Sequence, residues 1–194
     1  KLWVQRLSYV GELGYELYVK KDDSKEIYNL IVEKGKKYKL SNCGMHAMDI
    51  MRMETGFLHW GHDISPEENQ YEAGLNFAIS FKKNVDFIGK KSLLKLKEKK
   101  QKKKFLMFTL NECNPGEPLM LHDEPIYIDG KIAGRTTSGN YSFNFNKNLA
   151  FGYIKTDEDL ETIQNKLIEI EIEKKKYGAE ILKKPLNNKD FKNL

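Results

Sequence analysis

The hydrophobic pattern of the chain changes at a run of lysines, and this change limits the folds that are open to it. Residues 97–104 hold six lysines in eight positions. Before the run, helical spacing of apolar residues alternates with strand-like segments, and after it the apolar residues form short stretches typical of strands. The pattern favours the α+β class, with an α+β part over residues 1–100 and a small antiparallel β-barrel over residues 101–194.

The first part is expected to begin with two strands. Residues 3–20 alternate around Gly11-Glu12-Leu13-Gly14, which predicts a strand, a tight turn and a second strand. Asp22-Asp23-Ser24 is a helix-start signal, and Gly56 is a helix-stop signal. We therefore expect helix, helix, strand and helix over residues 24–37, 44–55, 75–81 and 86–102.

The second part reads as a series of short strands. Asp129-Gly130 joins two of them and is a strong signal for a β-hairpin. The expected strands lie at residues 105–110, 125–128, 131–134, 150–154 and 167–173. Strands of this length with turn residues between them indicate a barrel or a two-sheet roll.

Composition narrows the function classes. Hydrophobic residues make up 40% of the chain and charged residues 31%, with a net charge of +5, as in a folded protein with an ionic surface. The lysine run fits a solvated helix end or linker better than a nucleic-acid patch, so no nucleic-acid partner is expected. No apolar run reaches the roughly 20 residues of a membrane span. Cys43 and Cys113 form no CxxC pair, which favours a reducing compartment. We expect the cytoplasm, or the mitochondrial matrix if the protein is eukaryotic.

The sequence offers little for a metal or a flavin. His59 and His62 lie close together, but no cysteine or HExxH partner accompanies them, so we expect no metal site. No GxGxxG follows an expected strand, so FAD would need a domain upstream of these residues. The chain begins inside an expected strand without an initiator methionine, and we interpret it as part of a longer protein.

Three segments together resemble the glycine cleavage T-protein (aminomethyltransferase) family. Residues 8–16 are similar to its Tyr-x-Gly-Glu-x-Gly-aromatic-Glu motif, and residues 47–56 to its Ala-Arg-Asp-x-Leu-Arg-Leu-Glu-x-Gly helix. The segment Trp60-Gly61-His62-Asp63-Ile64-Ser65-Pro66, with residues 72–75 and 86–90, resembles the loop and strand that follow. Its Trp-Gly-His-Asp motif resembles the dimethylglycine and sarcosine dehydrogenase branch more than the free-standing T-proteins.

The resemblance implies a tetrahydrofolate-dependent one-carbon transfer that forms 5,10-methylenetetrahydrofolate. The donor would be a small methylated amine or an aminomethyl group. Two alternatives remain: a folate-binding or interaction module of the same fold without catalysis, and a folate-dependent demethylase. The oligomeric state is left open.

Four residues are expected at the folate site by this resemblance. The Glu16 carboxylate would accept the ring N–H and the amino group of the pterin edge as a bidentate pair. Tyr9 would line the pocket, or be a cross-strand core tyrosine. Arg52 is the second arginine of the helix motif, and a structural salt bridge is its alternative. Phe77 lies where the family commonly has a tryptophan near the pterin, and a core strand aromatic is its alternative.

The chain also departs from the family pattern. Met48 replaces the first arginine of the helix motif. The aspartate that the family uses in one-carbon transfer would precede the glutamate motif, outside these 194 residues, so the catalytic residue is unknown and we expect the chain alone to be inactive. The resemblance assigns no role to His62 and Asp63, and we expect turn or capping roles for Asp63 and Ser65.

Overall fold

The computed structural model describes residues 2–111 and 114–187, and it has the α+β class expected from the sequence. The chain divides into two compact units. One holds the residues up to Phe57 together with Asn187, and the other holds Leu58–Leu186. The domain boundary expected between residues 100 and 101 is a different division of the chain, and it stays a prediction. No helix of the described part combines the length and the apolar content that crossing a membrane requires.

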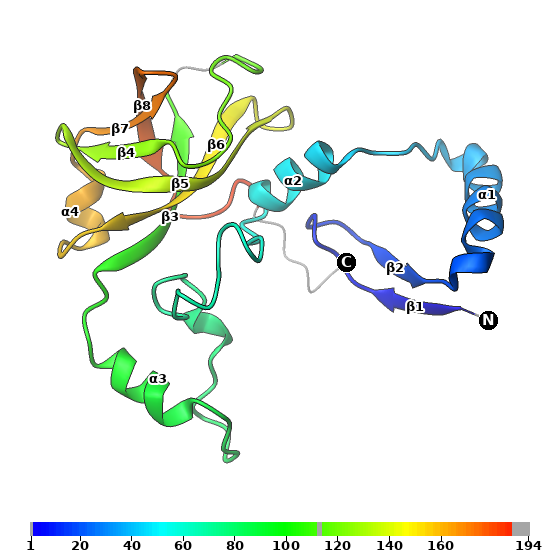
Figure 1. Cartoon of the computed structure of the whole chain (residues 1–194), viewed down its shortest axis with the longest axis horizontal. Coiled ribbons are helices and arrows are strands. Elements are labelled where there is room, and N and C mark those ends of the chain that lie inside the picture. The colour runs from blue at the N-terminus through cyan, green and yellow to red at the C-terminus, as the bar shows by residue number, and fades with distance from the viewer. Residues whose placement is uncertain (1, 112–113, 188–194) are drawn as a thin grey trace. The chain divides into compact units, whose positions relative to one another are not determined.

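The first unit contains the expected hairpin and the first two expected helices (Figure 1). Strands β1 (Trp3–Arg6) and β2 (Tyr15–Tyr18) pair antiparallel, so the strand–turn–strand prediction is confirmed. The helices end within two residues of their expected bounds. The remaining elements of this unit are η1 (Lys21–Asp23), α1 (Ser24–Gly35), η2 (Lys36–Tyr38) and α2 (Met45–Glu54).

The turn between β1 and β2 packs against the end of α2. Gly11 has a φ of 70°, and a Cβ added to it would lie 2.2 Å from the side-chain oxygen of Thr55. The Thr55 hydroxyl donates to the carbonyl of Met51 at 3.1 Å and lies 3.4 Å from the carbonyl of Val10. Both the backbone conformation and the lack of space require glycine at position 11. This contact holds the hairpin against α2.

The second unit contains a closed six-stranded antiparallel barrel with the strand order β3-β6-β5-β4-β7-β8 (Figure 1). Its core is made of buried aliphatic residues and Phe108, and it includes Ile163 of α4. The barrel prediction is confirmed, although the sequence pattern gave no sign of β8 or α4. The elements are β3 (Lys103–Leu110), β4 (Pro125–Ile128), β5 (Lys131–Ser142), β6 (Lys147–Lys155), α4 (Leu160–Gln164), β7 (Ile168–Ile172) and β8 (Lys175–Ile181).

The strand expected over residues 75–81 was wrong. This segment holds the 3-10 turn η3 (Asn76–Ala78), whose hydrogen bonds run from Ala78 N–H to the Leu75 carbonyl and from Ile79 N–H to the Asn76 carbonyl. Alternating apolar residues describe a possible strand face, but a strand also needs a partner for its backbone groups, and the described residues offer this segment none. The helix expected over residues 86–102 is shorter, since α3 spans Lys90–Lys97.

Asp63 joins the loop before α3 to the outer wall of the barrel. Its side chain is 1% exposed and accepts hydrogen bonds from the hydroxyls of Thr137 (2.5 Å) and Ser138 (2.8 Å). It also accepts the backbone N–H of His59 at 2.8 Å, which is the turn role expected from the sequence. The Tyr153 hydroxyl donates to the Asp63 carbonyl at 2.8 Å. One residue of the loop thus binds β5 and β6.

A second polar contact lies close to the first. Glu68 forms an ion pair with Lys103 of β3 and accepts hydrogen bonds from the backbone and hydroxyl of Ser65 at 2.8 and 2.7 Å. The Lys103 ammonium lies 4.5 Å from the ring centre of Tyr153. Burial raises the pKa of Tyr153, and the charges of Glu68, Asp63 and Glu72 add to the rise. The loop is therefore attached to the barrel by charged and hydrogen-bonded groups.

Replacing Asp63 by alanine is expected to lower the free energy of unfolding by about 2–3 kcal/mol, because the hydroxyls of half-buried Thr137 and buried Ser138 and the His59 N–H lose a charged acceptor. Urea unfolding of the full-length protein measures the change. Asp157→Ala is the control, since Asp157 is 72% exposed in a 3.6 Å ion pair with Lys102 and should have no measurable effect. Equal effects of the two substitutions would contradict the assigned role of Asp63.

Candidate functional site

Glu16 presents its carboxylate on an exposed strand. It lies in β2, two residues after the Gly11–Gly14 turn, and its side chain is exposed to solvent. The hydroxyl of Tyr18 donates to one of its oxygens at 2.6 Å. This hydrogen bond, followed by slight burial and the charge of Glu16, raises the pKa of Tyr18. Since a carboxylate has about four acceptor positions, Glu16 retains the capacity to accept further donors.

Tyr9 lies beside the same turn and stacks on an aromatic residue from beyond α2. The ring centroids of Tyr9 and Phe57 are 6.5 Å apart and the ring planes differ by 15°. Both side chains are half-buried. This pair gives the first unit an aromatic surface next to the glycine turn. Tyr9 lies outside β1 and β2, so it is not the cross-strand core tyrosine considered from the sequence, and its contact with folate stays a prediction.

Arg52 is fully buried in α2 and held by fixed partners. Its Nε lies 2.9 Å and its Nη2 2.8 Å from Oδ1 of Asp49, and its Nη1 donates to the carbonyl of Phe57 at 3.1 Å. The structural salt bridge considered from the sequence is therefore present. The guanidinium fixes the backbone at Phe57, the residue on which Tyr9 stacks. A direct contact between Arg52 and folate stays a prediction.

Phe77 belongs to the second unit. It is 81% exposed on η3 and does not lie in a strand. Three of the four expected site residues belong to the first unit: Tyr9, Glu16 and Arg52. Tyr9 and Arg52 both contact Phe57. The role of Phe77 stays a prediction.

Two further residues support this part of the molecule and had no signal in the sequence. Thr55 provides the surface on which Gly11 packs. Asn187, which is 132 positions further along the chain, donates its backbone N–H to the carbonyl of Glu54 at 2.7 Å, and its side-chain amide lies 3.5 Å from the Thr55 hydroxyl. Only their partners in space reveal these contacts.

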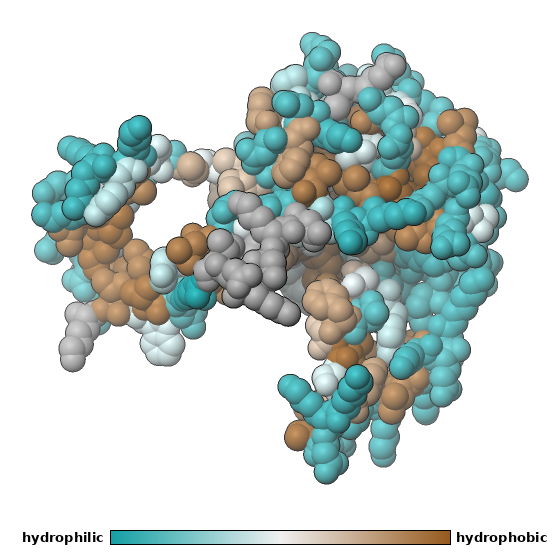
Figure 2. Space-filling model, turned by 180° about the vertical axis from the view of Figure 1, so that it is seen from behind, coloured by the Kyte–Doolittle hydropathy of each residue, from teal (hydrophilic) through white to brown (hydrophobic). Residues whose placement is uncertain are grey.

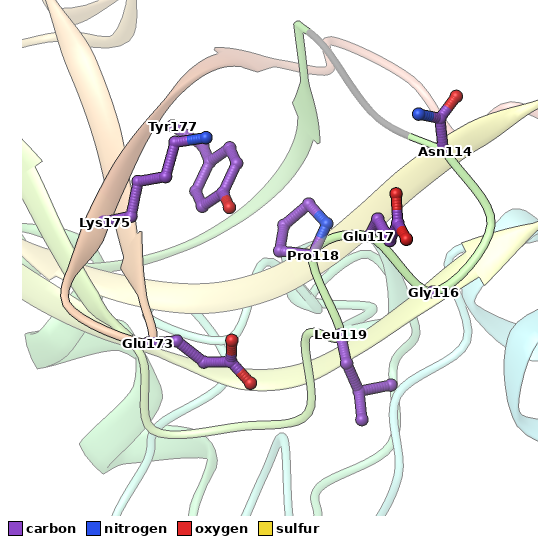
Figure 3. A pocket seen from close by; sticks show the side chains of 8 residues that line it. All are labelled: Asn114, Gly116, Glu117, Pro118, Leu119, Glu173, Lys175 and Tyr177. Carbon is purple, nitrogen blue, oxygen red and sulfur yellow. The ribbon is translucent and has the colours of Figure 1, made fainter.

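The barrel carries a surface pocket of about 430 Å³ (Figure 3). Its side chains come from the loop before β4 and from the β7–β8 hairpin. The Lys175 ammonium lies 4.8 Å from the centre of the Tyr177 ring, and two carboxylates lie at the rim, so no single charge dominates. The pocket is lined by Asn114, Gly116, Glu117, Pro118, Leu119, Glu173, Lys175 and Tyr177, none of which is an expected folate residue.

The sequence matches two family models. Residues 1–83 match the GCVT N-terminal domain, and residues 103–187 match the glycine cleavage T-protein C-terminal barrel domain. The chain is 37% identical to the mitochondrial dimethylglycine dehydrogenase of Homo sapiens over 93% of its own length and 20% of that protein. It is 33% identical to an aminomethyltransferase of Halothermothrix orenii over 94% of its length and 49% of that protein.

The fold also matches a solved structure. The aminomethyltransferase T of the glycine cleavage system from Bartonella henselae superposes with a TM-score of 0.80 at 20% identity, over 95% of this chain and 49% of that one. The chain thus spans about a fifth of the dehydrogenase and half of the aminomethyltransferases that it resembles. With both halves of the sequence matched in order, the chain belongs to the glycine cleavage T-protein (aminomethyltransferase) family.

Proposed function

We propose that this chain provides one wall of a tetrahydrofolate site in a one-carbon transferase, with Glu16 holding the pterin ring. The observation that carries the proposal is the exposed carboxylate of Glu16 at the end of the family motif, with acceptor positions left after its bond to Tyr18. The edge of a pterin offers a ring N–H and an amino group side by side. A carboxylate accepts both, and its charge strengthens the pair.

The other residues of the first unit act on the shape of this wall. Tyr9 and Phe57 offer a flat aromatic surface beside the turn that precedes Glu16. Arg52 holds the backbone of Phe57 in place from inside α2. When bound, reduced folate supplies the nucleophilic nitrogens that accept a one-carbon unit, and the protein contributes orientation and electrostatics. A contact of Phe77 with folate is kept as a proposal.

The donor would be a small N-methylated amine or an aminomethyl group. Two relatives favour the former: the dimethylglycine dehydrogenase named above, and a 4-methylaminobutanoate oxidase (formaldehyde-forming) of Paenarthrobacter nicotinovorans, 36% identical over 93% of this chain and 21% of that protein. The product would be 5,10-methylenetetrahydrofolate, FAD would belong to a domain upstream, and the enzyme would act in the cytoplasm or the mitochondrial matrix.

A folate-binding module of the same fold without catalysis is the second candidate. Met48 at the position of the family's first helix arginine weakens the case for glycine-cleavage activity proper, because any contact made by that arginine is missing or replaced, and it fits the dehydrogenase branch better. Turnover of dimethylglycine or sarcosine with tetrahydrofolate by the full-length protein separates the transferase from the binding module. A binding module forms no 5,10-methylenetetrahydrofolate.

Glu16→Gln in the full-length protein is expected to weaken tetrahydrofolate binding by about 2–4 kcal/mol, roughly 30- to 1000-fold. The amide presents one acceptor where the pterin edge offers two donors, and its NH₂ group faces a donor. Calorimetric titration with a stable reduced folate measures the loss. Glu12→Gln, in the same turn, is the control and should leave the affinity nearly unchanged. Equal losses, or a larger loss at Glu12, would place the pterin on a different group.

Arg52→Met is expected to lower the free energy of unfolding by about 3 kcal/mol. The substitution removes a buried cation, so the carboxylate of Asp49 and the carbonyl of Phe57 lose the guanidinium as a donor. Arg52→Lys should recover only part of the loss, since an ammonium does not reproduce the fork geometry of the guanidinium. Denaturant unfolding measures both, with exposed Arg135→Met as the control. Lost folate affinity at unchanged stability would instead indicate that Arg52 contacts the ligand directly.

A further inference from the structure

The β1–β2 hairpin places Gln5 beside Glu16 on one face. The two residues are Cα partners in the antiparallel register, and partners in such a pair point their side chains to the same side, about 5 Å apart at Cβ. Both side chains are exposed. In the described part of the chain the Gln5 amide makes no hydrogen bond, so its donor and acceptor groups are open to a ligand.

Two aromatic residues flank this amide and carboxylate. Trp3 and Tyr18 form the next partner pair on the same face, and they are 65% and 52% exposed. Apolar side chains of this unit are widely exposed, as the brown surface in Figure 2 shows. A flat ring lying on this face would therefore meet aromatic surface at the end of the hairpin and polar groups at its centre.

The opposite face of the hairpin has a different character. Its partner pairs are Val4 with Leu17 and Arg6 with Tyr15. It carries the Arg6 guanidinium and the Tyr15 hydroxyl but no carboxylate, so it lacks a charged acceptor for two neighbouring ligand donors. The carboxylate and the side-chain amide of the two strands both lie on the Glu16 face.

The chemistry of this pair fits an edge with three groups in a row. A pterin that carries an oxo group presents an amino group, a ring N–H and a carbonyl next to one another. Glu16, which only accepts, suits the first two, and the NH₂ of an amide suits the third. The spacing of directly opposed residues across an antiparallel pair is of the order of the width of such an edge.

We propose that Gln5 is a binding residue of this site, donating its side-chain N–H to the carbonyl of the pterin ring while Glu16 accepts the ring N–H and the amino group. The proposal rests on the proposed function and extends it by assigning the third hydrogen bond of the pterin edge. Trp3 and Tyr18 then pack against the ring system from the same face of the hairpin.

The test compares Gln5→Leu, Gln5→Lys and Val4→Thr in the full-length protein, with 5-formyltetrahydrofolate as the stable probe. Gln5→Leu removes the donor and should weaken binding about 3- to 10-fold, the range of one neutral hydrogen bond. Gln5→Lys keeps a donor at this position and should retain most of the affinity. Val4→Thr changes the opposite face and should have no effect. Equal urea midpoints show that the variants are folded.

Infrared difference spectra of probe labelled with ¹³C at the ring carbonyl give a readout that a merely structural role would not move. Loss of the hydrogen bond in Gln5→Leu should shift the carbonyl stretch to higher wavenumber, and Gln5→Lys should shift it back. Unchanged affinity and an unchanged stretch in Gln5→Leu, with Glu16→Gln still weakening binding, would overturn the role of Gln5 alone. Absence of probe binding to the unmodified protein would overturn the proposed function, and this inference with it.

Discussion

The close approach of Gly11 to Thr55 is the constraint on which the first unit depends. A side chain at position 11 would collide with Thr55, and the backbone there has a positive φ. One glycine therefore permits both the turn and its packing against the end of α2. The turn sets the register of β1 and β2, and the register places Gln5 opposite Glu16. A two-stranded sheet has little stability of its own, so the contact of Gly11 with Thr55 is important for holding the Glu16 carboxylate in position.

The second unit is built around a closed barrel. Its barrel closes on itself, so all of its strands have hydrogen-bonded neighbours on both sides and the core is internal. Asp63 then attaches an irregular loop to that rigid wall through two hydroxyls of β5, a form of attachment that requires no regular structure in the loop. The expected pterin-binding carboxylate belongs to the first unit, while the barrel provides the stable body of the second.

Most of the correct predictions from the sequence came from residues close together in the chain, such as turn and hairpin residues. The glycine turn before Glu16 and the Asp129-Gly130 hairpin are both present, with Asp129 and Gly130 at positive φ. The alternating apolar residues around Phe77 wrongly predicted a strand over residues 75–81. Such a pattern shows which side chains would share a face, but it does not show whether a partner strand is present. Asn187 beside Thr55 was invisible for another reason: its contact depends on how distant segments meet in space, which no spacing in the sequence encodes. The same holds for the buried position of Asp63.

Hydrogen–deuterium exchange of the full-length protein, with and without reduced folate, shows which segment the ligand covers. If Glu16 holds the pterin, the amides in residues 2–18 will exchange more slowly when folate is bound, because the ligand covers the Glu16 face and stabilises the hairpin. The barrel amides of residues 103–110 and 147–155 should exchange at unchanged rates. Slower exchange confined to the barrel, with none in the hairpin, would contradict the assignment of Glu16 as the residue that holds the pterin.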